Sequence, residues 1–282
     1  MSRGAGSGRP EEPIGIFDSG IGGLTVLREI LTIMPSEDVI YLGDTARVPY
    51  GIRSPETVEK YAVENTEFLL ENRIKLIVVA CNTASAVSLD ALKKTTKVPV
   101  VGVLLPGAEA AVRKTANRRI GVIGTEATIR SMAYQRAIVS IDPEVVVTGV
   151  ACPLFVPLVE EGWTDGEITR SVAREYLGRL KDSGIDTLVL GCTHYPLLKG
   201  VIKDVVGEGI ALIDSAVETA KTVRETLEAA GLSRRRNDSP IRRFYVTDDP
   251  ARFRKVGERF LGRRITCIEK VEIPLTGQAA HR

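Results

Sequence analysis

Residues 186–196 read DTLVLGCTHYP, an apolar run that ends on a glycine and is followed by a cysteine, a threonine and a histidine. A second stretch, VVACNTAS at residues 78–85, has the same layout, with Cys81 after the apolar run. Strands buried in parallel sheets are apolar throughout, and ligands bind beyond their carboxyl ends. The two stretches therefore predict two parallel strands that each present one cysteine, Cys81 or Cys192, at a binding edge.

The sequence around these stretches repeats in the same order in two halves of the chain. Longer segments with helical spacing separate the apolar patterns. This order predicts an α/β fold with two similar open parallel-sheet domains and an active site in the cleft between them. Chance similarity among apolar strands is the alternative. The pairs are IGIFDS (14–19) with IGVIGT (120–125), VIYLG (39–43) with VVVTG (145–149), and IVVACN (77–82) with LVLGCT (188–193).

The bulk composition points to no strongly charged partner. The 282 residues carry 38 basic and 36 acidic side chains, so we expect no direct nucleic-acid binding. No apolar run approaches the ~20 residues of a membrane helix, and residues 1–13 lack the apolar core of a secretory signal. We therefore expect a cytoplasmic protein that does not contact a membrane, with a disordered tail over residues 1–13.

The four cysteines, Cys81, Cys152, Cys192 and Cys267, are far apart and form no C-x-x-C pair. This spacing disfavours a metal site, a thioredoxin-type motif and a disulfide framework, so we expect no bound metal. A free cysteine is commonly a small buried hydrophobe, and we interpret Cys152 and Cys267 in this way. Cys81 and Cys192 differ, because polar residues follow each of them at the end of a predicted strand.

A helix is predicted to begin just after Cys81 and another just after Cys192. Asn82 and Thr83 can cap the first helix, and Pro196 suits the first turn of the second. The positive end of a helix dipole favours a thiolate, which is a base. Two matched thiols on opposite faces of a ligand suit inversion of a stereocentre, because one removes a proton from carbon while the other delivers one.

The stretch FDSGIGGLT at residues 17–25 follows the first predicted strand. With Asp44 further along, it invites comparison with the dinucleotide-binding pattern G-x-G-x-x-G, but Thr25 stands at the third glycine position. We prefer a tight turn that lets a substrate approach the backbone. Asp18 would then assist proton transfer or bind a substrate ammonium group, although Asp18, like Ser19, could instead cap a helix.

His194 lies two residues after Cys192 and could act as its acid/base partner. A hydrogen-bonded structural histidine is the alternative. Glu160 and Glu161 follow the apolar run CPLFVPLV and could supply a carboxylate near the cleft, or could end a solvated helix. These residues alone leave both pairs of alternatives open.

Six stretches of the chain carry a specific pattern, in a fixed order. They are FDSGIGGLTV (17–26), YLGDTARVPYG (41–51), VVACNTAS (78–85), GVIGTEATIRS (121–131), CPLFVPLVEEG (152–162) and LVLGCTHYPLL (188–198). Together they closely resemble the glutamate racemase family, within the aspartate/glutamate racemase superfamily. The resemblance runs from about residue 14 to residue 273 and shows no departure at a functional position.

The resemblance implies a cofactor-independent racemase that interconverts L- and D-glutamate and supplies D-glutamate for peptidoglycan. By the family pattern, Cys81 takes the proton from D-glutamate and Cys192 takes it from L-glutamate. Asp18 is implied as the helper of Cys81. Glu160 and His194 are implied as helpers of Cys192. No cofactor is expected.

The resemblance also implies how the substrate is held and how the chain is divided. Hydroxyls, amides and backbone N–H groups, rather than an arginine clamp, would bind the two carboxylates of glutamate. Residues 14–105 and 215–282 would form the first domain and residues 106–214 the second, and a homodimer is expected. The implied substrate contacts are Asp18, Ser19, Tyr50, Gly51, Asn82, Thr83, Thr125, Thr193 and His194.

Other interpretations remain open at this point. A racemase of another amino acid or of a hydantoin would need only a different pocket. A thiol hydrolase would use Cys192 and His194 but would leave Cys81 unexplained. A two-domain binding protein could clamp a small ligand at its hinge. A nicotinamide enzyme is disfavoured by the missing glycine.

Overall fold

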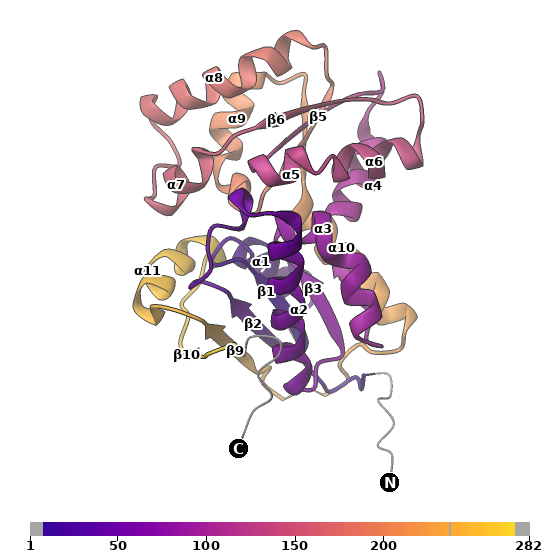
Figure 1. The fold of residues 1–282 in the computed structure, drawn as a ribbon, viewed down its shortest axis with the longest axis vertical. Coiled ribbons are helices and arrows are strands. Elements are labelled where there is room, and N and C mark those ends of the chain that lie inside the picture. Colours follow the sequence, from indigo (N-terminus) through magenta and orange to yellow (C-terminus); the bar gives the residue numbers. More distant parts are fainter. Residues whose placement is uncertain (1–7, 237, 274–282) are drawn as a thin grey trace.

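The computed structural model describes residues 8–236 and 238–273, and these form two parallel β-sheets (Figure 1). The first sheet has the strand order β10-β9-β2-β1-β3-β4, and the second has the order β6-β5-β7-β8. The predicted fold class, two open parallel-sheet α/β domains, is therefore confirmed. The strands are β1 (Ile14–Asp18), β2 (Val39–Gly43), β3 (Leu76–Val79), β4 (Val100–Gly102), β5 (Arg119–Gly124), β6 (Val146–Ala151), β7 (Thr187–Gly191), β8 (Ala211–Asp214), β9 (Arg242–Val246) and β10 (Ile268–Lys270).

Helices cover both faces of each sheet, and three clusters of buried residues fill the spaces between them. Among the described helices, none is long and apolar enough to span a bilayer. The α-helices are α1 (Leu24–Ile33), α2 (Pro55–Glu71), α3 (Asn82–Thr95), α4 (Leu104–Lys114), α5 (Glu126–Arg130), α6 (Ala133–Ile141), α7 (Phe155–Glu160), α8 (Glu167–Asp182), α9 (Lys199–Val206), α10 (Ser215–Ala229) and α11 (Pro250–Leu261). Two 3₁₀ turns are η1 (Tyr50–Ile52) and η2 (Tyr195–Leu198).

The internal repeat predicted from the sequence is visible in the order of the strands. Strands β5, β6, β7 and β8 take the positions in the second sheet that β1, β2, β3 and β4 take in the first. Ile14 pairs with Leu76, and its counterpart Ile120 pairs with Thr187. The strands that precede Cys81 and Cys192, β3 and β7, therefore occupy the same place beside the first strand of their half.

The second repeat pair is displaced by two residues from its predicted match. Ile14 pairs with Val39, but Ile120 pairs with Val147 rather than with Val145. The reason is that β6 is an edge strand whose residues are exposed or half-buried. Its apolar pattern therefore constrains the register weakly.

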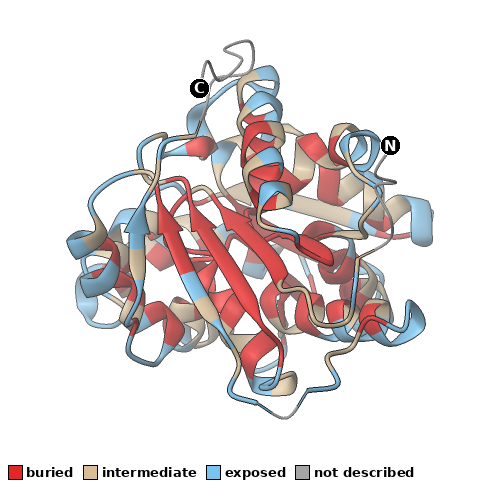
Figure 2. Ribbon diagram, turned by 90° about the horizontal axis from the view of Figure 1, so that it is seen from below, coloured by how far each residue is buried: buried red, intermediate tan, exposed pale blue. Residues whose placement is uncertain are grey.

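The centre of each sheet is fully buried, as Figure 2 shows for the first sheet. Every residue of β1, β2, β3 and β7 is buried. Continuous apolar runs are stable in this position because helices remove both faces from water. The buried strands place the turns that follow them in a fixed position, and these turns carry the two cysteines.

The N-terminal segment differs from the sequence prediction, because its residues Pro10 and Pro13 are held by hydrogen bonds. Lys75 donates hydrogen bonds through its backbone N–H to Pro13 O (3.0 Å) and through Nζ to Pro10 O (2.7 Å). These contacts hold the last part of the tail that was expected to be disordered over residues 1–13. Residues 1–7 and 274–282 lie outside the described residues.

The two domains are joined by α4 and α10. Helix α10 follows β8 of the second sheet but packs against α1, which covers the first sheet. Helix α4 begins at Leu104 and packs against both α6 and α10. The division at residues 105 and 214 stays a prediction, and the two sheets fall on either side of it.

Candidate active site

A cavity of about 360 Å³ is lined by turns from both domains. The turns follow β1 and β3 in the first sheet and β5 and β7 in the second, so the carboxyl ends of both sheets face the same space. The structure brings together nearly all the residues singled out in the sequence. Those that line the cavity are Ser19, Tyr50, Gly51, Cys81, Asn82, Thr83, Thr125, Glu160, Cys192, Thr193 and His194.

Cys81 occupies the N-cap position of α3 and is separated from the end of β3 by Ala80 alone. Burial and the nearby Asp18 carboxylate raise the pKa of its thiol to about 12, against the opposing effect of the Ala84 backbone N–H and the Ser19 hydroxyl. The predicted stabilisation of a thiolate by the helix N-terminus is therefore outweighed at this cysteine. Cys81 is therefore a thiol at neutral pH.

Asp18 is the one predicted site residue that does not line the cavity. It ends β1, is 1% exposed, and accepts a hydrogen bond from the Gly20 backbone N–H at 2.9 Å. Burial raises the pKa of Asp18, although His194 and backbone N–H groups act in the opposite direction. Its electrostatic effect on Cys81 fits a helper of that thiol, and a direct contact of Asp18 with a substrate stays a prediction.

Cys192 follows β7 and is 6% exposed, as is Cys81. The predicted helix does not begin immediately after Cys192, because η2 intervenes before α9 starts at Lys199. A residue of the first domain holds the turn that lies between β7 and η2. Thr25 donates a hydrogen bond through Oγ1 to Thr193 O at 2.9 Å. This contact joins the first turn of α1 to the turn that carries Cys192.

His194 connects Cys192 to a carboxylate. Its Nδ1 lies 3.9 Å from Sγ of Cys192, and its Nε2 lies 3.3 Å from Oε1 of Glu160. Burial lowers the pKa of His194, but its contacts with Cys192 and Glu160 outweigh burial and raise the pKa to about 10. Hydrogen bonding from His194 in turn lowers the pKa of Glu160. The three groups form a chain in which His194 is an imidazolium at neutral pH.

Hydroxyl groups from both domains meet on the cavity wall. Oγ1 of Thr83 lies 3.0 Å from Oγ1 of Thr125 and 3.2 Å from Oγ1 of Thr128. Asn82 accepts a hydrogen bond from the Tyr134 hydroxyl at 2.7 Å. Asn82 and Thr83 therefore do not cap α3, as the sequence suggested, but lie in its first turn and face the second domain.

The Tyr50 hydroxyl is already engaged within the protein. It donates a hydrogen bond to Oδ2 of Asp44 and accepts one from Nδ2 of Asn65 at 3.1 Å. A substrate contact at this position would therefore come from the backbone. Asp44 is fully buried and accepts hydrogen bonds from Tyr50 and Arg47, which argues against the comparison of this region with a dinucleotide-binding pattern.

Gly51 explains how closely the two domains approach each other. A Cβ atom at residue 51 would lie 2.8 Å from Cβ of Thr125, a distance that real side chains do not reach. The glycine therefore permits the turn at η1 to touch the N-cap of α5 across the cleft.

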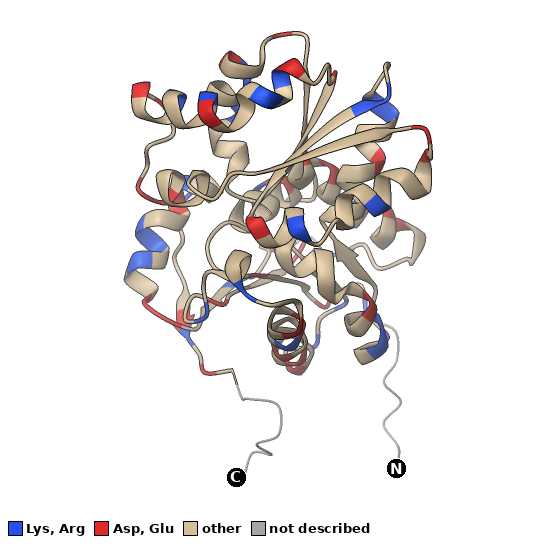
Figure 3. Ribbon diagram, turned by 45° about the horizontal axis from the view of Figure 1, so that its top comes forward, with Lys and Arg blue, Asp and Glu red and all other residues tan. Residues whose placement is uncertain are grey.

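The charge pattern is mixed over the surface and sparse in the cavity. Figure 3 shows acidic and basic segments interspersed over both domains. Among the described residues that line the cavity, none is lysine or arginine. The described residues also contain no group of three or more His, Cys, Asp or Glu side chains arranged to hold a metal ion.

The sequence gives no sign of the part that α11 plays at this site. Helix α11 contacts two residues of the site from far along the chain. Glu160 is contacted by Arg252 and Arg259, and the ring of His194 is contacted by Phe260. No local motif marks these residues, because their contacts depend on how one domain lies against the other.

Comparison with known proteins places the chain among racemases. A family model described as Asp/Glu/Hydantoin racemase matches residues 14–223. A glutamate racemase from Geobacter metallireducens is 56% identical over 264 residues, which cover 94% of this chain and 98% of the relative.

Solved structures agree with this assignment. Glutamate racemase from Francisella tularensis in complex with D-glutamate superposes with a TM-score of 0.89 at 40% identity, covering 94% of this chain and 98% of that one. Glutamate racemase from Thermus thermophilus in complex with β-chloro-D-alanine superposes with a TM-score of 0.86 at 45% identity, with the same coverage. By sequence and by fold, the chain belongs to the Asp/Glu/hydantoin racemase family.

Proposed function

We propose that this chain is a cofactor-independent glutamate racemase in which Cys81 and Cys192 exchange protons with the substrate Cα from opposite faces. The observation that carries the proposal is the equivalence of the two thiols: each follows the third strand of its own half, and both line one cavity. A thiol hydrolase would need only Cys192 with His194, so it gives Cys81 no task.

In the L-to-D direction, the Cys192 thiolate removes the Cα proton and the Cys81 thiol donates its proton to the opposite face. The Cα–H bond on the Cys192 face breaks and its proton bonds to Sγ of Cys192. The S–H bond of Cys81 breaks as a new Cα–H bond forms on the opposite face, so the negative charge passes from Cys192 to Cys81. The raised pKa of Cys81, about 12, keeps it protonated and ready for this direction. In the D-to-L direction, Cys81 must first be a thiolate, and the two cysteines exchange roles.

The helper groups differ between the two sides. A positively charged His194 at 3.9 Å stabilises negative charge on Cys192, and Glu160 keeps His194 charged. Asp18, buried beside Cys81, disfavours a thiolate there until the ammonium group of a substrate adds a positive charge. Asp18 thus acts on Cys81 through its charge.

The lining of the cavity suits an amino acid with two carboxylates. Hydroxyl and amide groups of Ser19, Asn82, Thr83, Thr125 and Thr193 supply neutral donors, and backbone N–H groups at the turns add others. Neutral donors can bind a carboxylate without the strong electric field of a guanidinium. Negative charge develops on Cα during the reaction, and the two thiols and their helpers then have the main influence on it. The relative from Francisella tularensis that was crystallised with D-glutamate supports this substrate.

The wider role rests on the family resemblance. We propose that the D-glutamate enters peptidoglycan synthesis, that the protein works in the cytoplasm, and that it forms a homodimer. Expression of the chain in a bacterial strain that requires external D-glutamate should remove that requirement. A Cys81→Ser variant expressed at the same level should leave it in place.

The activity itself is tested with purified protein and L-glutamate, without any added cofactor. Circular dichroism of the substrate should decay to zero, because L- and D-glutamate have equal free energies. L-aspartate, which is shorter by one methylene, serves as the matched control and should decay at least tenfold more slowly. A decay with aspartate but not with glutamate would point to another racemase of the family, and no decay with either would contradict the proposal.

A further inference from the structure

Helix α11 belongs to the first domain but lies against the second at the end of α7 (Figure 1). It follows β9 of the first sheet and packs on α1. Its exposed basic side chains include Arg252 and Arg259, which are seven residues apart and so lie on the same face of the helix. Both arginines reach one residue of α7, Glu160.

Each oxygen of the Glu160 carboxylate has its own partner. Oε1 lies 3.3 Å from Nε2 of His194, and Oε2 lies 3.2 Å from a guanidinium nitrogen of Arg252. Arg259 donates a hydrogen bond to the backbone oxygen of Glu160 at 2.5 Å. The side chain and the backbone of Glu160 are therefore both held from the opposite domain.

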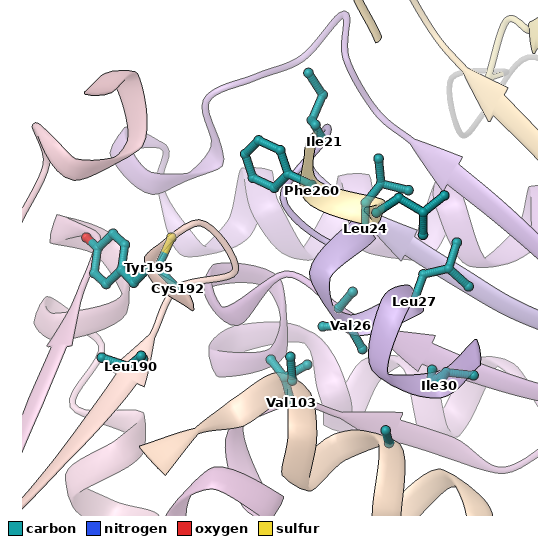
Figure 4. Packing of buried hydrophobic residues seen from close by; sticks show 14 of the residues in the cluster. Ile21, Leu24, Val26, Leu27, Ile30, Val103, Leu190, Cys192, Tyr195 and Phe260 are labelled. Carbon is teal, nitrogen blue, oxygen red and sulfur yellow. The ribbon is translucent and has the colours of Figure 1, made fainter. Parts of the chain in front are cut away.

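The same helix also supports the ring of His194. The ring of Phe260 lies edge to face against it, with centroids 5.1 Å apart and planes at 82°. Phe260 is fully buried and belongs to the same apolar cluster as Cys192 (Figure 4). Three side chains of α11 thus touch the chain of groups that ends at Cys192.

We infer that Arg252 is a positioning residue for the racemase: by holding Glu160 from the first domain, it keeps His194 aligned with Cys192 in the second. This inference rests on the proposed function, because it assigns His194 and Glu160 to the Cys192 half of the reaction. The Cys192 half of the reaction then depends on contact between the two domains, because Arg252 and Glu160 meet only when α11 lies against α7. The corresponding support is not needed for Cys81, whose helper Asp18 lies in the same domain.

Two effects of Arg252 on His194 have opposite signs, and this makes the inference testable. The groups that face His194 are Cys192, Glu160, Asp18 and the ring of Phe260. If Arg252 acted only as a nearby positive charge, its removal would raise the pKa of His194. If it positions Glu160, its removal releases that carboxylate, and the pKa of His194 falls.

Histidine-selective NMR can measure this pKa directly, because the chain contains only two histidines, and His281→Gln identifies the second signal. We expect Arg252→Ala to lower the pKa of His194 by about one unit. The value of kcat should fall about three- to tenfold with little change in KM, since Arg252 does not line the cavity. Arg252→Lys should restore most of both values.

Lys255→Ala is the matched control. Lys255 lies on the same groove between α11 and α7, and its removal deletes the same charge near Glu160. This variant should leave kcat unchanged, and the pKa of His194 should stay the same or rise slightly but should not fall. A rise in the pKa in Arg252→Ala, or a change equal to that in Lys255→Ala, would overturn the inference.

The NMR titration separates this inference from the proposed function. If the wild-type protein does not racemise glutamate, the proposed function fails whatever Arg252 does. If the wild-type protein is active and the pKa of His194 does not respond to Arg252, the positioning inference fails alone.

Discussion

Nδ1 of His194 lies 3.9 Å from Sγ of Cys192, two residues before it in the chain. The position that corresponds to His194 in the first half is occupied by Thr83, whose hydroxyl bonds Thr125 and Thr128 instead of the thiol. The repeat therefore places two thiols equivalently but gives them different partners. A positive group accompanies Cys192, whereas an acidic residue, Asp18, accompanies Cys81.

The clearest consequence of the two-thiol arrangement concerns single substitutions. Cys81→Ser and Cys192→Ser should each lower kcat/KM by about 10²- to 10⁴-fold, because each removes a positioned acid/base group. The loss should be equal in both directions, since the equilibrium constant between enantiomers is one. Circular dichroism with each enantiomer measures this. Cys267→Ser, at an exposed cysteine, should keep full activity. Full activity in Cys81→Ser would contradict the mechanism.

The raised pKa of His194 predicts a pH-dependent contribution to stability. Its folded-state pKa is about 10 and its ordinary value is 6.5, so the folded protein binds a proton more tightly than the unfolded chain. The stabilisation is complete below about pH 6.5 and is lost as the pH rises towards 10. The difference in unfolding free energy between wild type and His194→Gln should therefore shrink over this range in urea titrations. A difference that is constant with pH would show that His194 is neutral.

Asp18 should influence Cys81 through its charge. Replacing it in Asp18→Asn removes a carboxylate that helps to raise the pKa of Cys81, so this pKa should fall below about 12. The rate of alkylation of Cys81 against pH, measured in a Cys192→Ser background, reports the shift. The rate of racemisation by Asp18→Asn should fall at least tenfold, because the pKa of Cys81 is then no longer matched to its role as acid and base. An unchanged alkylation profile would rule out this role.

Gly22 holds the two catalytic turns in contact, so its substitution should separate activity from folding. A Cβ atom at residue 22 would lie 2.1 Å from Oγ1 of Thr193 and 2.6 Å from Nδ1 of His194. Gly22→Ala should push the turn after β7 away and lower kcat more than tenfold. Its cost in stability should be about 1–3 kcal/mol.

The control for Gly22→Ala is Gly178→Ala. Gly178 lies within α8, and a Cβ atom there meets nothing within 4 Å. Alanine favours a helix interior over glycine by roughly 1 kcal/mol, so this variant should be fully active and slightly more stable. Equal activity in the two variants would mean that the turns do not need this close contact.

The sequence predicts the two sheets and the location of Cys81 and Cys192 after strand ends, because both depend on local patterns. Apolar runs that end in cysteine mark the strand ends, and the repeat makes Cys81 and Cys192 equivalent. What the sequence does not reveal depends on contacts between distant segments. The positions of Arg252 and Phe260 at the site follow from the way α11 meets α7, and no spacing along the chain encodes this. The burial of Asp18 outside the cavity is likewise a result of packing.

The central claim is that two different groups serve the two faces of Cα, and hydrogen exchange tests it most directly. Protein in deuterated water should be given L-glutamate, and both enantiomers should be separated and analysed by mass spectrometry during the first few per cent of reaction. With Cys192 removing protium and Cys81 delivering deuterium, the first D-glutamate formed should carry deuterium at Cα while the remaining L-glutamate keeps its protium. D-glutamate that retains the substrate protium, or L-glutamate that gains deuterium as fast as D-glutamate appears, would contradict the account.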